Sequence, residues 1–361
     1  MNGAGGTTTP SSATPPPVTP ARLAVSRSRR LSTLWEQWGI ALVLLALAVV
    51  AAIIDPGFLT ISNIQSIMRE SAYVGIVAAG MTMVIMNGTF DLSVGGQLAL
   101  VSSISLMGYA AGGTPLAILA ALAAGLACGL VNGVIITRLF VNPFVTTLST
   151  LFLFRGITFV LTQDGPKTLP YSEADSLYVA IGSANVLGVP VPFLIMLVVF
   201  GATWVILRRT VVGRRTIAFG SSPEAARFCG ISEARLRMFL FGLVGLCVGV
   251  AALTFVTRVW TADGGIAEGF ELQVIAAVVL GGTSLKGGRG TLIGTFAAVL
   301  LVSGLNDFLV SQHVPASYQR IVLGVVLITA LAIDGLRTGT ARPSNWRMFR
   351  RRRREEVTRP T

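Results

Sequence analysis

The residues that could do chemistry are few, and they gather in three stretches. The first is Asn87–Gly96, where the acid Asp91 stands among glycines and hydroxyl side chains. The second is Glu271–Thr291, where a short apolar run ends in a glycine-rich segment. The third is the arginine-rich loop from Arg208 to Arg237. These stretches raise three possibilities: a carboxylate in a membrane pathway, a phosphate-binding loop and a protein-docking surface.

The glycine-rich segment does not match a phosphate-binding loop. A P-loop requires Gly, four residues, Gly, Lys and then Ser or Thr. Here Lys286 lies between Leu285 and Gly287, and no other part of the sequence supplies the pattern. We therefore predict that this chain hydrolyses no ATP and binds no cofactor.

Other catalytic or metal chemistry has little support. His313 is the single histidine, and Cys128, Cys229 and Cys247 have no paired spacing. This composition gives no disulfide framework and no metal site. No nucleophile has a base beside it in the pattern that covalent catalysis needs. A membrane-embedded enzyme is therefore disfavoured.

Asp91 has two interpretations. A carboxylate near hydrocarbon is costly and faces protein or water, and irregular backbone at that depth lines a cavity or is buried in protein. A broken helix that dips into the membrane would satisfy both conditions. Alternatively, Asp91 lies in a short cytoplasmic turn and caps the next helix.

A short helix is predicted inside the loop 208–237. Ser222 can cap it, Pro223 suits its first position, Glu224 in its first turn suits the helix dipole, and Gly230 can end it. Such a helix could dock into another protein or lie on the lipid surface. The pattern favours docking.

The composition places the chain in a membrane. Apolar residues make up 53% of the 361 residues and charged residues 12%. Soluble globular chains carry about 25% charged residues. So few charges cannot cover a soluble protein of this size, whereas they suit an outer surface that faces lipid.

Charge-free stretches long enough to cross a bilayer recur along the chain, since a crossing takes about 20 mostly apolar residues. We predict an all-α polytopic membrane protein with about ten transmembrane helices, some of them broken or re-entrant. Gly112, Gly113 and Pro115 divide one long stretch into two spans. The predicted spans lie at 38–54, 71–90, 92–137 (two spans), 142–163, 191–207, 238–257, 272–285, 291–306 and 317–333.

The basic residues set the orientation. Lys and Arg accumulate on the cytoplasmic side of membrane proteins. With both termini in the cytoplasm, most of the 28 basic residues fall on that side. Five do not: Arg69, Arg155, Lys167, Arg258 and Arg320. For Arg155, inside an apolar span, snorkelling to the outer interface is favoured over pairing or facing water.

The composition divides the chain into three predicted regions. Residues 1–34 read as a disordered cytoplasmic tail, rich in Gly, Thr, Ser and Pro. Residues 35–336 form the transmembrane domain, and residues 337–361 form a basic cytoplasmic tail. The arginine run in that tail suits anionic lipid headgroups better than a specific protein or nucleic-acid contact, so no nucleic acid is expected as a partner.

Three motifs spread over roughly residues 35–335 give a family resemblance. The first comprises Gly80–Met86 and Asp91–Gly95. The other two comprise Asn132-Gly133, Asn142–Leu148 and Arg155-Gly156, and then Gly213-Arg214, Glu224–Arg227, Gly230-Ile231, Glu271-Leu272, Ile275–Ala277 and Gly281–Gly290. With these motifs the sequence resembles the ribose, xylose and arabinose type of sugar permease in ATP-binding-cassette (ABC) importers. It departs from that family at Asn87-Gly-Thr-Phe, which stands in place of the Gly-Gly-Ile run typical before Asp-Leu-Ser.

The resemblance implies a multi-pass protein of the inner membrane that works in a complex. A second permease chain, a cytoplasmic ATPase that holds ATP and magnesium, and an extracytoplasmic sugar-binding protein would complete it. The helix that couples to the ATPase would comprise Ser222, Pro223, Glu224, Ala225, Ala226, Arg227 and Gly230. Candidate positions on the path or in broken helices are Asn87, Asp91, Ser93, Gly95, Asn142, Phe144, Thr147, Glu271, Gly281, Gly282, Thr283 and Ser284.

Two other transporters remain open. A branched-chain amino acid permease belongs to the same superfamily. A secondary transporter driven by protons or sodium needs titratable groups at mid-membrane, for which Asp91 and Glu271 are the main candidates. The motifs favour a monosaccharide importer of the ribose, xylose or galactose class.

Overall fold

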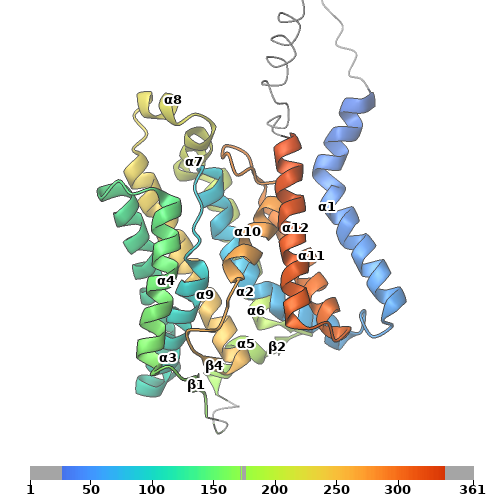
Figure 1. The fold of residues 1–361 in the computed structure, drawn as a ribbon, viewed down its shortest axis with the longest axis vertical. Coiled ribbons are helices and arrows are strands. Elements are labelled where there is room, and N and C mark those ends of the chain that lie inside the picture. The colour runs from blue at the N-terminus through green and yellow to red at the C-terminus, as the bar shows by residue number, and fades with distance from the viewer. Residues whose placement is uncertain (1–26, 171, 173–175, 338–361) are drawn as a thin grey trace, which may run out of the picture.

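A computed structural model describes residues 27–170, 172 and 176–337. The predicted tails lie outside the described residues at 1–26 and 338–361, but residues 27–34, predicted to be disordered, form the start of the first helix. The described part is mostly helical, with four two-residue strands (Figure 1). Its helices are α1 (Arg27–Ile54), α2 (Ile61–Met86), α3 (Val94–Arg138), α4 (Pro143–Thr162), α5 (Leu177–Ser183), α6 (Val191–Arg209), α7 (Val211–Ser221), α8 (Pro223–Phe228), α9 (Glu233–Val259), α10 (Phe270–Leu280), α11 (Leu292–Ser311) and α12 (Ala316–Arg337).

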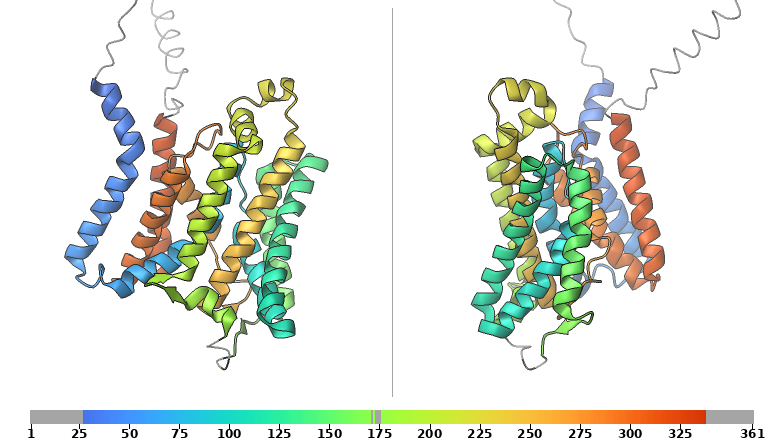
Figure 2. Two further views of the ribbon diagram at one scale, coloured as in Figure 1. Left: turned by 180° about the vertical axis from the view of Figure 1, so that it is seen from behind. Right: turned by 60° about the vertical axis from the view of Figure 1, so that its left-hand side comes forward.

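The long helices run between two ends of a bundle (Figures 1 and 2). One end carries α7 and α8, together with the start of α1 and the end of α12, and is called the α8 end. The opposite end, called the α5 end, carries α5 and the strands. Five of the described helices, α3, α4, α6, α9 and α11, are long and apolar enough to cross a membrane. The chain is therefore an all-α polytopic membrane protein.

The strands form two small antiparallel pairs at the α5 end. β1 (Lys167–Thr168) pairs with β4 (Thr261–Ala262). β2 (Asn185–Val186) pairs with β3 (Val189–Pro190) in a hairpin. The sequence did not predict these strands, because two-residue strands carry no alternating pattern.

α2 is the central helix. Nearly every residue from Ser71 to Met86 is buried, on all sides of the helix. A helix that is apolar all round belongs in a core. Helices α6, α9, α10 and α11 surround α2, so α2 is held by much of the bundle.

α3 is a hairpin of two helical arms. The turn between them lies at Gly112 and Gly113, and Gly113 has a φ of 70° that favours glycine. The predicted break in this long stretch is therefore confirmed. Next to the turn Gly108 faces Ala117 and Ala120 on the other arm.

The second arm of α3 packs closely against α9 through glycines. Gly125 and Gly129 lie against the backbone of α9 at Gly245, Gly249 and Phe241. Small residues let transmembrane helices approach at backbone distance. This contact is the most extensive between any two elements of the described structure.

Several helices begin earlier than the predicted spans. α2 begins at Ile61, where Thr60 caps it, and not at residue 71. α9 begins at Glu233, where Ser232 caps it, and not at residue 238. The polar first turns carry no hydropathy signal, but side-chain caps satisfy their backbone N–H groups.

The loop 208–237 holds two helices where one was predicted. α7 begins after Thr210, whose hydroxyl accepts a hydrogen bond from the N–H of Gly213. Gly213 packs against the backbone of Leu207, at the end of α6. α7 was missed because its 11 residues mix polar and apolar side chains in the way that loop sequence does.

Candidate functional site

The predicted short helix in this loop is confirmed as α8. The hydroxyl of Ser222 accepts a hydrogen bond from the N–H of Ala225, and Pro223 is the first helical residue. Glu224 lies in the first turn and is exposed. Cys229 is the C-cap, and Gly230 follows it with a φ of 77°. α8 therefore stands at the edge of the bundle with its acidic first turn open (Figure 1).

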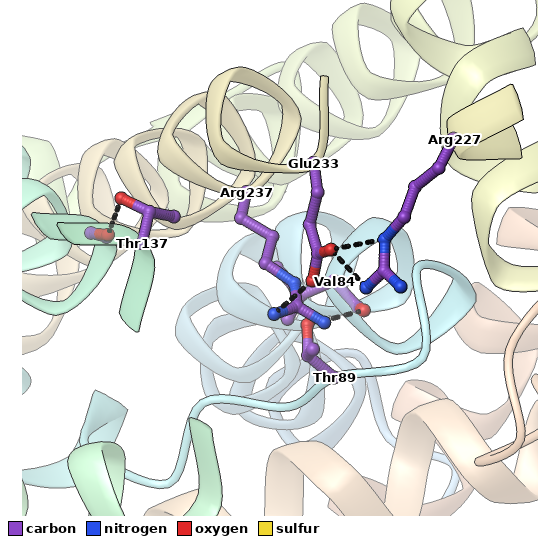
Figure 3. Close-up of polar contacts among 7 residues, drawn as sticks. Val84, Thr89, Thr137, Arg227, Glu233 and Arg237 are labelled. Carbon is purple, nitrogen blue, oxygen red and sulfur yellow. Dashed lines mark hydrogen bonds and ion pairs between the residues drawn. The ribbon is translucent and has the colours of Figure 1, made fainter. Parts of the chain in front are cut away.

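An ion-pair cluster joins α8 to α9. Arg227, in the last turn of α8, donates from Nε to Oε2 of Glu233 at 3.0 Å. Arg237, one turn further along α9, pairs with Oε1 of the same carboxylate at 2.6 Å. Figure 3 shows Glu233 between the two guanidinium groups. One carboxylate thus connects the end of α8 to the start of α9.

Phe219 on α7 completes this cluster. Its side chain is fully buried. The guanidinium carbons of Arg227 and Arg237 lie 5.8 and 5.9 Å from the centre of its ring. These distances suit cation–π attraction. Helices α7, α8 and α9 therefore meet in one group of four side chains.

The same cluster lies beside the end of α2. Arg237 points toward Val84 and Thr89 (Figure 3). There the N–H and hydroxyl of Thr89 donate to the carbonyl of Val84 at 3.2 and 3.3 Å. Gly220 on α7 lies against the carbonyl of Met86, with no space for a Cβ atom. The ion-pair cluster and α7 therefore both border the end of the central helix.

The two glycine-rich breaks meet at this point. The N–H of Gly288 donates to the carbonyl of Met86 at 2.8 Å. Gly287, with a φ of 86°, lies against the backbone of Gly88. Only glycine tolerates both that conformation and that approach. The breaks were predicted one in each half of the chain, and the structure brings them together at the α8 end.

Asp91 is fully buried in a polar cluster next to this junction. Its carboxylate accepts hydrogen bonds from the N–H and hydroxyl of Ser93 at 2.9 and 2.5 Å. Gln97 donates to it at 3.1 Å and Asn132 at 3.4 Å. Gln97 and Asn132 also donate to the Ser93 hydroxyl, each at 2.7 Å. These bonds tie the α2–α3 connection to both arms of α3.

The interpretation of Asp91 as a helix cap in a short turn is wrong. The N-cap of α3 is Ser93, and Asp91 lies two residues before it. The alternative agrees with the structure, because irregular backbone and a carboxylate are both enclosed by protein. Buried polar groups require partners, and four donors supply them here.

The other predicted path residues form separate contacts. The side chain of Asn142 caps α4, Thr147 is buried on that helix, and Phe144 meets Phe90 edge-on at 6.0 Å. Gly95 on α3 lies directly against the carboxylate of Glu271.

At the other end of α10, Gly281 packs on the backbone of Thr295 in α11. Gly282 turns the chain with a φ of 87°. Thr283 and Ser284 are buried. The candidate positions therefore fall at both ends of α10, in the α2–α3 connection and at the starts of α3 and α4, and do not form one compact site.

The predicted snorkelling of Arg155 is wrong. Its guanidinium donates to the carbonyl of Gly264 at 3.4 Å and to that of Ala267 at 3.1 Å. It therefore holds the loop before α10 against α4. Free carbonyls of an irregular loop are better partners for a guanidinium than the distant interface.

Sequence reasoning missed Gln97, Phe219, Glu233 and Arg237. The four-residue spacing of Glu233 and Arg237 is a helical ion-pair signal. It was overlooked because the helix was placed to start after them. Phe219 carried no signal, since its ring meets the arginines only in the folded chain.

Comparison with known proteins places the chain in a family. Residues 63–331 match the family described as branched-chain amino acid transport system / permease component. The chain is 40% identical over 301 residues to the ribose import permease protein RbsC of Bacillus subtilis (strain 168), covering 83% of this chain and 92% of that protein. It is 38% identical over 314 residues to RbsC of Escherichia coli (strain K12), covering 86% and 97%.

A third relative is named for a different sugar. The chain is 32% identical over 305 residues to the L-arabinose transport system permease protein AraH of Escherichia coli (strain K12), covering 83% of this chain and 91% of that protein. No solved structure matches the chain. Both the extent of the family match and the identities exceed what chance similarity gives. The chain belongs to the branched-chain amino acid transport system / permease component family, as a multi-pass permease of the inner membrane.

Proposed function

We propose that this chain is the membrane-spanning subunit of an ABC importer for a monosaccharide of the ribose, xylose or galactose class. The single observation that supports it most is α8, a capped helix at the edge of the bundle that is fixed to α9 through Glu233. Such a helix suits docking to another protein. The names of the relatives supply the substrate class, since RbsC and AraH are named for ribose and L-arabinose.

We infer ten crossings with the α8 end in the cytoplasm. Each of the two arms of α3 crosses the membrane once. The other eight crossings are α1, α2, α4, α6, α9, α10, α11 and α12. The arginines of α7 and α8 and at the end of α6 support this orientation, because basic residues accumulate on the cytoplasmic side.

The proposed complex has a separate ATPase, which holds ATP and magnesium, below the α8 end. A sugar-binding protein would dock at the α5 end, and a second copy of this chain would complete the membrane part. Closure of the ATPase on ATP would move α8, and the Glu233 cluster would pass that movement to α9 and α2. The result would be a shift of population between inward- and outward-facing states.

A branched-chain amino acid permease is the second candidate. The family description itself favours it. A proton- or sodium-driven carrier has less support: Asp91 already accepts four hydrogen bonds, and a coupling site needs a group that is free to exchange its ion.

The test is transport by reconstituted protein. The chain, its ATPase and its binding protein are placed in proteoliposomes, and uptake of ribose, xylose, galactose and leucine is measured. Sugar uptake that requires ATP and the binding protein is the expected result. Leucine uptake alone would support the second candidate, and uptake that an uncoupler abolishes without ATP would refute both.

Glu224→Lys tests α8 in the same assay. We expect loss of ATPase binding and of uptake, because the exposed first turn of α8 changes charge. Gln312→Lys is the matched control for ATPase binding, since Gln312 is exposed at the opposite end of the bundle. Equal loss of ATPase binding in both variants would show a general effect of added charge and refute the docking role.

A further inference from the structure

A cavity of about 240 Å³ lies between α10, α11 and α12 at the α5 end. The first turn of α12 and the last turn of α11 form its outer part, at Ala316, Gln319 and Leu309. None of the positions predicted from the sequence lines it. Pockets for drug-sized ligands measure about 300–1,000 Å³, so this cavity suits a smaller molecule.

Aromatic rings form the inner wall. Tyr73 lies 5.2 Å from Phe255 and 6.0 Å from Phe270, measured between ring centres. All three residues line the cavity. Aromatic rings give an apolar contact surface, and a few placed polar groups then fix the orientation of a ligand.

Amide side chains supply the polar groups. Gln273, Asn306 and Gln319 line the cavity. Asn306 donates to Glu70 and Gln319 donates to the carbonyl of Val314. Gln273 is half-buried, and within the described part of the chain its amide has no hydrogen-bond partner. That amide is available to a ligand.

An ion pair stands at the rim. Arg320 on α12 donates to Glu268, in the loop before α10, at 3.1 Å. Both side chains are more than 60% exposed, so the pair is weak and can open. The loop that carries Glu268 is held on its other side by Arg155 of α4. The rim is therefore fixed at one side and openable at the other.

We propose that this cavity binds the transported monosaccharide as it enters from the α5 end. The proposal rests on the proposed function. A sugar ring offers C–H faces to Tyr73 and Phe270 and hydroxyl groups to Gln273 and Gln319. The two charges at the rim are paired with each other, so a neutral ligand fits better than an amino acid, which would need a free partner for each of its charges.

The test removes the free amide without changing its volume. Gln273→Met keeps the shape of the side chain, and Gln312→Met is the matched control at an exposed position outside the cavity. The full complex in proteoliposomes is assayed for uptake of labelled ribose, xylose and galactose. The ATPase activity stimulated by the binding protein is measured in the same vesicles.

We expect sugar uptake in Gln273→Met to fall about three- to tenfold, as for a lost hydrogen bond, with stimulated ATPase activity retained. Gln312→Met should match the unaltered protein. Equal uptake in Gln273→Met and the control would overturn the proposal and leave the cavity as a packing void or a lipid site. Absence of ATP-dependent uptake by the unaltered complex would instead refute the proposed function.

A second variant covers the case in which Gln273→Met fails to fold. Ala316 is exposed at the rim, so Ala316→Trp narrows the entrance without disturbing the core. Ser317→Trp is its control, since Ser317 is exposed and does not line the cavity. A selective fall in uptake for Ala316→Trp supports the site, and equal uptake in both variants refutes it.

Discussion

Glu233 at the start of α9 binds Arg227 in the last turn of α8, with 3.0 Å between Oε2 and Nε. The contact crosses the turn that connects the two helices. It fixes the exposed helix to one that passes through the bundle and packs on α2. This relationship gives α8 a defined position, which a loop of this length would not have by itself.

Glu233→Gln is expected to lower ATP-dependent uptake with little loss of stability. Arg227 is largely exposed, and exposed ion pairs contribute at most about 1 kcal/mol. Coupling between sites, however, is lost when the connecting contact weakens, so uptake should fall about fivefold or more. Uptake assays and thermal unfolding in detergent measure the two effects. Unchanged uptake would show that the pair has no role in coupling. Gln312→Leu, at an exposed position outside the cluster, serves as the control.

Asp91→Leu is expected to destabilise the fold by about 2–5 kcal/mol. The change leaves one N–H each of Ser93, Gln97 and Asn132 buried without its acceptor, and each such group costs about 1–3 kcal/mol. Asp91→Asn keeps one oxygen and should cost less. Thermal unfolding of the purified protein measures both.

The control for Asp91 is Glu224→Leu, an exposed acid without a role in the core. It should unfold at nearly the same temperature as the unaltered protein. If Asp91→Leu were as stable as this control, the buried cluster would have no structural role, and a function in transport would be the better explanation.

Gly245→Ala is expected to loosen the packing of α3 on α9. A methyl group at Gly245 would meet the carbonyl oxygen of Gly125. Overpacking of this kind costs about 1–3 kcal/mol. Gly156→Ala is the matched control, because Gly156 lies in α4 with open space around it. The unfolding midpoint should drop only for Gly245→Ala, and equal midpoints would contradict the close approach.

Arg155→Leu is expected to free the loop before α10 while the bundle stays folded. The carbonyls of Gly264 and Ala267 lose their donor. Hydrogen exchange at 263–269 should rise at least about three- to tenfold, the effect of losing one of these two hydrogen bonds. Arg155→Lys should restore part of the protection. Exchange that stays unchanged in Arg155→Leu would show that other contacts hold the loop.

The sequence by itself determined the class of fold and the positions of most elements. Apolar runs predicted the membrane helices, because each crossing needs a minimum length of apolar surface. Local caps predicted α8, since Ser222 and Pro223 act on backbone groups within three residues. The glycines at 112 and 113 marked the hairpin of α3 for the same reason: the information is local.

Only the tertiary structure decided which of these residues meet. The partners of Asp91 come from both arms of α3, and Gly88 and Gly287 touch across about 200 residues of chain. Arg155 donates to carbonyls of a loop about 110 residues further along the chain. Glu233 contacts Arg227 because α9 begins before its apolar part. Hydropathy reports how a segment partitions between water and lipid, whereas hydrogen bonds and ion pairs depend on which segments pack side by side, and that packing is set by the whole chain.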